Sequence, residues 1–81
     1  MSISLRAATL RAALERVVDE PVRVDCTDRT VRLYAPAPPA RDTDAWARLF
    51  GVLRTADWWG STDAHGTPEV WAEITETEGD R

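Results

Sequence analysis

The sequence predicts a small α+β domain in which two helices pack on one face of a four-stranded, mainly antiparallel sheet. Two segments repeat apolar residues at helical spacing, and two others alternate apolar and polar residues around a turn-rich stretch. In chain order they give helix, hairpin, helix, hairpin, an αββαββ order. We expect one domain over residues 1–75 and a polar, frayed C-terminal tail over residues 76–81.

Residues 4–20 are predicted to form the first helix. One apolar stripe of helical period runs through Ile3, Ala7, Leu10, Leu14 and Val17. Ser4 is suited to cap the N-terminus, and Pro21 excludes helical geometry for the residue before it.

The first predicted hairpin covers residues 22–35. Its apolar positions are Val22, Val24 and Cys26 on one arm and Val31, Leu33 and Ala35 on the other. If Cys26 lies opposite Val31, all six share one face and Cys26 points into the core. The same register sets Arg23 opposite Tyr34 and Asp25 opposite Arg32, two favourable cross-strand pairs.

A proline-rich linker over residues 35–40 leads to a second helix, predicted over residues 44–56. Asp42 or Thr43 is suited to cap it. Its expected apolar face consists of Trp46, Leu49, Phe50, Leu53 and Ala56. Gly51 is costly inside a helix, so we expect another backbone to approach it closely, from the first helix or from a second subunit.

The closing hairpin contains three of the four tryptophans and the only histidine, His65. With Thr62 opposite Thr67, Trp59 meets Val70 and Trp58 meets Trp71. Trp59 is then expected in the core. Trp58 and Trp71 lie on the other face, where they either anchor a partner or stack on one another and shield the sheet.

The sheet face away from the helices is the candidate interaction surface. The predicted registers place five residues of partner-binding type there: Arg23, Arg32, Tyr34, Trp58 and Trp71. Tryptophan, tyrosine and arginine dominate the energies of protein interfaces. A chain of 81 residues is also near the lower limit for folding alone, which favours a homodimer or a protein partner.

Catalytic, cofactor-binding and metal-binding residues are not predicted. Glu69 and Glu73 are four positions apart on a strand, roughly 13 Å, too far for paired-carboxylate hydrolysis. Asp63 and His65 lie in a turn without a recognised ligand spacing. The glycines do not cluster into a phosphate-binding loop.

Charge disfavours direct nucleic-acid binding. Residues 1–40 carry six arginines against five acids, whereas residues 41–81 carry four arginines against nine acids. An acidic surface repels the phosphate backbone. Two alternatives stay open: a nucleic-acid-binding regulator that stacks bases on the sheet, and an acidic inhibitor, of phage or mobile-element type, that occupies a nucleic-acid-binding partner.

The sequence therefore predicts a non-catalytic interaction or regulatory module. Its single cysteine cannot form an internal disulfide, which favours a cytoplasmic location. Its apolar runs are too short to span a membrane.

Overall fold

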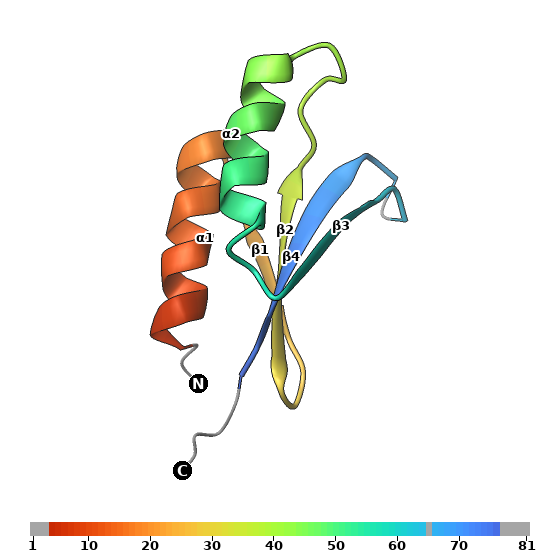
Figure 1. The fold of residues 1–81 in the computed structure, drawn as a ribbon. Helices are drawn as coiled ribbons and strands as arrows, with labels where there is room; N and C mark the ends of the chain where they lie inside the picture. The colour runs from red at the N-terminus through yellow and green to blue at the C-terminus, as the bar shows by residue number, and fades with distance from the viewer. Residues whose placement is uncertain (1–3, 65, 77–81) are drawn as a thin grey trace.

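A computed structural model describes residues 4–64 and 66–76 and confirms the α+β class and the αββαββ order (Figure 1). The elements are α1 (Leu5–Val18), β1 (Arg23–Cys26), β2 (Thr30–Pro36), α2 (Thr43–Leu53), β3 (Trp58–Thr62) and β4 (Glu69–Thr75). The chain thus consists of two successive αββ halves.

The four strands form one antiparallel sheet with the order β1-β2-β4-β3. Both helices lie on the same side of it (Figure 1). The central strands β2 and β4 come from different halves of the chain and pair along their whole length, from Thr30 opposite Thr75 to Pro36 opposite Glu69. Strands β1 and β3 are the two edges.

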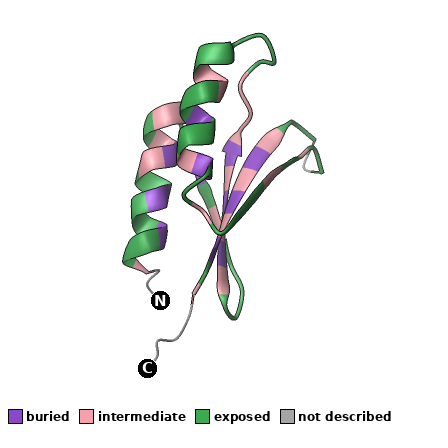
Figure 2. Cartoon of the chain, viewed as in Figure 1, coloured by how far each residue is buried: buried purple, intermediate pink, exposed green. Residues whose placement is uncertain are grey.

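The core lies between the helices and the two central strands. Its buried residues are Ala7, Leu10 and Leu14 of α1, Leu49 and Leu53 of α2, Val22, and Val31, Leu33, Ala35, Val70, Ala72 and Ile74 of the central strands. Figure 2 shows buried residues alternating with half-buried ones along β4. This alternation gives the sheet one face toward the helices and one away from them.

The first helix begins as predicted and ends early. The Oγ of Ser4 accepts a hydrogen bond from the Ala7 N–H at 3.0 Å, so Ser4 is the N-cap. The helix stops at Val18 because Asp19 takes a left-handed conformation, with φ of 57°. Ile3, the first residue of the predicted stripe, lies outside the described residues.

The second helix is capped by Asp42, whose side chain accepts from the Ala45 N–H. It ends at Leu53, three residues before the predicted end. The prediction that α1 approaches Gly51 closely is wrong. Gly51 is exposed, and a Cβ added there would meet no atom within 4 Å.

The first hairpin has the predicted register, including Arg23 opposite Tyr34 and Asp25 opposite Arg32. The prediction that Cys26 is buried is wrong, because Cys26 is exposed although its partner Val31 is buried. It is the last residue of a four-residue edge strand, where no neighbouring strand covers its outer side.

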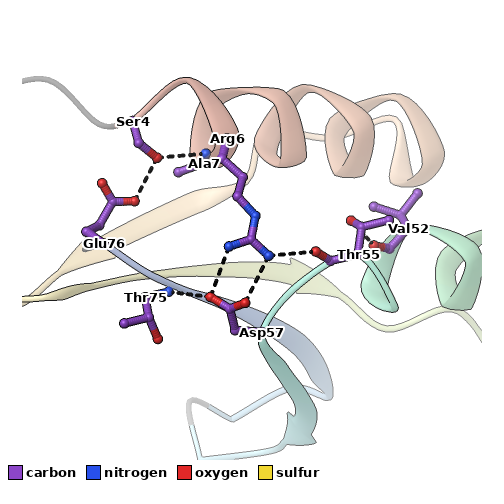
Figure 3. Close-up of polar contacts among 8 residues, drawn as sticks. All are labelled: Ser4, Arg6, Ala7, Val52, Thr55, Asp57, Thr75 and Glu76. Carbon is purple, nitrogen blue, oxygen red and sulfur yellow. Dashed lines mark hydrogen bonds and ion pairs between the residues drawn. The ribbon is translucent and has the colours of Figure 1, made fainter. Parts of the chain in front are cut away.

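Polar contacts join α1 to the start of β3 and the end of β4 (Figure 3). The guanidinium of Arg6 donates to both carboxylate oxygens of Asp57, at 2.9 and 3.2 Å, and to the carbonyl of Thr55. Asp57 also accepts from the Thr75 N–H at 2.8 Å. The hydrogen bond from Arg6, with that from Thr75, holds the pKa of Asp57 below its usual value.

Ser4 closes the same corner, since its Oγ donates to Glu76 Oε2 at 2.7 Å. Residues from both ends of the described chain are therefore fastened together. The rest of the predicted frayed tail, residues 77–81, lies outside the described residues.

Candidate functional site

All five residues predicted to bind a partner lie on the sheet face away from the helices, here called the outer face. Arg23 is opposite Tyr34, and Tyr34 is opposite Trp71. In the next row, Arg32 is opposite Glu73, and Glu73 is opposite Trp58. Directly paired residues share a face of the sheet. The outer face therefore brings together aromatic rings and arginines from all four strands.

Arg32 is held at the centre of the outer face. Its Nη2 and Nε donate to Glu73 Oε1 at 2.6 and 3.1 Å, and its guanidinium lies 4.1 Å from the ring centroid of Trp71. The hydrogen bonds to Glu73 and then to Tyr34 raise the pKa of Arg32. Arg32 is therefore a fixed cation that also orients the indole ring.

Arg23 makes a parallel arrangement one row away. Its guanidinium lies 4.4 Å from the ring centroid of Tyr34, and its Nη1 pairs with Glu69 Oε2 at 3.2 Å. Since Glu69 belongs to β4, Arg23 reaches across β2 to make this pair. Each arginine is thus stacked on a ring and paired with a carboxylate.

Trp58 is the most exposed of the three aromatic side chains on the outer face, with 66% of its surface exposed. The predicted register of the second hairpin is wrong by two residues, because Trp58 is opposite Glu73 and Thr62 is opposite Glu69. The connecting loop is therefore longer than expected and contains Pro68, which cannot donate a ladder hydrogen bond. A shift of two residues leaves every side chain on its predicted face.

Trp71 is opposite Gly60 instead of Trp58. A Cβ added to Gly60 would be 2.7 Å from Cζ2 of Trp71, so the indole ring occupies the space above this glycine. The expected direct pairing of Trp58 with Trp71 is thus replaced by a ring lying on bare backbone.

Trp59 points toward the helix side as predicted, but it is not a core residue. It remains 42% exposed and its ring is 5.4 Å from that of Phe50, which is itself 39% exposed. Because β3 is an edge strand, Trp59 has a neighbouring strand on one side only. In the sequence, Pro68 near the start of the second arm favours that arm as the edge strand, whereas in the structure the first arm, β3, is the edge.

The charges of the outer face largely cancel. Arg23 pairs with Glu69 and Arg32 pairs with Glu73, while Asp25 adds a further acid. A phosphate backbone would have to compete with these carboxylates for the two arginines.

Within residues 4–64 and 66–76, no group of three or more histidine, cysteine, aspartate or glutamate side chains could hold a metal ion. His65 lies outside those residues. Neither helix in the described part of the chain is long and apolar enough to cross a membrane.

Comparisons of the chain with protein-family models, with curated proteins and with solved structures give no match.

Proposed function

We propose that this chain is a small non-catalytic interaction module that forms a homodimer through its outer face. The observation that carries the proposal is the open, ring-bearing face, from which Trp58 extends with 66% of its surface exposed. Exposed aromatic patches mark interaction sites, and tryptophan is among the residues that contribute most to interface energies.

Preorganisation also supports this use of the outer face. The arginine stacks and the ion pairs to Glu69 and Glu73 already hold Tyr34 and Trp71 in place. A partner would therefore pay little entropy to order these side chains. The outer face carries charges of both signs. Two copies related by a two-fold axis can therefore set opposite charges against one another.

A nucleic-acid-binding regulator is the alternative, since rings on an open sheet can stack bases. Salt separates the two functions. Phosphate contacts weaken steeply as salt rises, whereas an aromatic dimer interface should change little.

Light scattering across a dilution series, at low and high salt, tests the dimer. We expect a dimer whose dissociation constant is insensitive to salt and rises about thirtyfold or more in the Trp58→Ala variant. Leu5→Ala is the matched control, because Leu5 is also a large exposed apolar residue but lies on α1. A monomer at every concentration, or a Trp58→Ala variant that dimerises like the wild type, would contradict the proposal.

A further inference from the structure

The two edges of the sheet differ in how they are protected. Strand β1 has four residues, of which Arg23 and Asp25 are charged, and it follows Pro21. Strand β3 reads Trp-Trp-Gly-Ser-Thr, with neither a charge nor a proline. Short length, charge and proline are the usual means of blocking an edge against further pairing. Strand β3 is also short, with five residues, but it has neither a charged residue nor a proline.

In the described part of the chain, β4 is the strand that pairs with β3. Every second residue of an antiparallel strand directs its N–H and C=O to the side away from its partner. The outer edge of β3 therefore offers a row of backbone donors and acceptors to another extended chain.

An aromatic groove runs beside this edge, on the helix side of the sheet. A hollow of about 470 Å³ is lined by Ala47, Phe50, Arg54 and Trp59. A second hollow is lined by Trp46 of α2, by Ser61 and Thr62 of β3 with Asp63 beyond them, and by residues 37–40, Pro68 and Glu69. The rings of Trp46 and Phe50 are 5.4 Å apart, so one aromatic stripe borders both hollows. A strand added to β3 would place alternate side chains against this stripe.

The ends of the groove have opposite charge. Asp63 lines the end beyond β3, and Arg54 lines the end nearest Trp59. Neither forms an ion pair with another described residue. A strand antiparallel to β3 would begin beside Asp63 and finish beside Arg54.

We infer that β3 binds an extended peptide segment of a partner protein by antiparallel strand addition. The segment carries a basic residue at its start, small β-branched residues over the aromatic groove, and an acidic residue at its end. This is the β-augmentation mode, in which the backbone supplies affinity and the groove supplies specificity.

Charge favours such a segment over β3 of a second copy. Two β3 strands paired antiparallel about Gly60 would set Asp57 of one copy opposite Asp63 of the other, at both ends of the pairing. Like charges directly opposite one another destabilise a sheet.

The probe is the fluorescently labelled, N-acetylated peptide Arg-Thr-Val-Thr-Val-Thr-Glu, measured by anisotropy against the full chain. Two derivatives are methylated on the amide nitrogens of either the valines or the threonines. Only one of these sets can face β3, so we expect one derivative to lose affinity about tenfold or more and the other to retain it. A peptide with its terminal charges exchanged should bind more weakly.

Variants locate the site. Phe50→Ala should weaken peptide binding about tenfold, as expected for an anchor ring, while Leu5→Ala should not. Tyr34→Ala should also leave peptide binding intact, because Tyr34 lies on the outer face of the central strand β2 and β4 separates it from β3; this separates the groove from the proposed dimer surface. Equal binding of both methylated peptides, or of the charge-exchanged peptide, would overturn the inference. An affinity that rises as the protein is diluted would assign the edge to a second copy instead.

Discussion

The indole ring of Trp71 lies directly over Gly60, so close that an added Cβ would be 2.7 Å from its Cζ2 atom. Arg32 also holds the ring in this position, since its guanidinium lies 4.1 Å from the ring centroid. Gly60 does not have the positive φ that would favour glycine on its own account. Its lack of a side chain is therefore what allows Trp71 to cover β3.

Gly60→Ala is expected to lower the free energy of unfolding by about 1–3 kcal/mol, the usual cost of overpacking. Gly51→Ala is the matched control, because a Cβ there meets nothing within 4 Å. Alanine in helix α2 should raise stability by up to about 1 kcal/mol. Urea unfolding measures both variants, and equal effects would contradict our account of Gly60.

Arg32→Lys is expected to destabilise the fold although it keeps the positive charge. Lysine cannot reproduce the planar stack on Trp71 together with two hydrogen bonds to Glu73. We expect a loss of about 1 kcal/mol on urea unfolding. Arg48→Lys, at an exposed position on α2, provides the comparison and should change stability little. If both variants unfold alike, the stack does not contribute.

Asp57→Asn is expected to change how stability depends on pH. The pKa of Asp57 is lowered in the folded state, chiefly by Arg6. Its contribution is therefore complete above the unfolded value of about 3.9, and is lost as pH falls through the lower folded pKa.

Urea unfolding at several pH values tests this dependence. At neutral pH we expect Asp57→Asn to lower the free energy of unfolding by only about 1 kcal/mol. Solvent screens this ion pair, because the side chains of Arg6 and Asp57 are 53% and 33% exposed. The difference from the wild type should shrink toward acid pH. Asp63→Asn, in the β3–β4 loop, is the control. A difference that stays constant with pH would show that the carboxylate charge is not responsible.

Asp19→Gly is expected to raise the free energy of unfolding by up to about 1 kcal/mol. Asp19 has φ of 57° at the C-terminal end of α1, a conformation that glycine adopts without strain. Removal of the acid also relieves repulsion by the negative end of the helix. Asp19→Asn should give part of the gain, since it removes only the charge. Thermal unfolding distinguishes the three chains, and a destabilised glycine variant would contradict the explanation.

The parts of the fold that depend on local pattern were predictable. The register of the first hairpin followed from setting Cys26 opposite Val31, which also matches Arg23 with Tyr34 and Asp25 with Arg32, and the structure confirms it. The cap at Ser4 followed from residue type and position, as did the choice of Asp42 or Thr43 for the second helix, where the structure shows Asp42. Because side chains alternate strictly along strands, the membership of the outer face survived even an error in register.

The remaining features depend on contacts between distant segments. The second register was wrong because nothing local fixed the length of the loop before Glu69. The exposure of Cys26 and Trp59 follows from the strand order, which places β1 and β3 at the edges. The pairing of Arg6 with Asp57 joins residues that are 51 positions apart and share no sequence pattern.

The central pairing of β2 with β4 also has a consequence for the chain when it is cut. Each αββ half contributes one central strand, and the only covalent link between the halves is the exposed connection near Pro39 and Ala40. Severed there, the fragments would carry net charges of +1 and −5 and would each expose an apolar strand. They should therefore reassemble when mixed, as the two parts of a split reporter do. Two intact chains could likewise exchange their second halves and retain the β2–β4 pairing and the shared core.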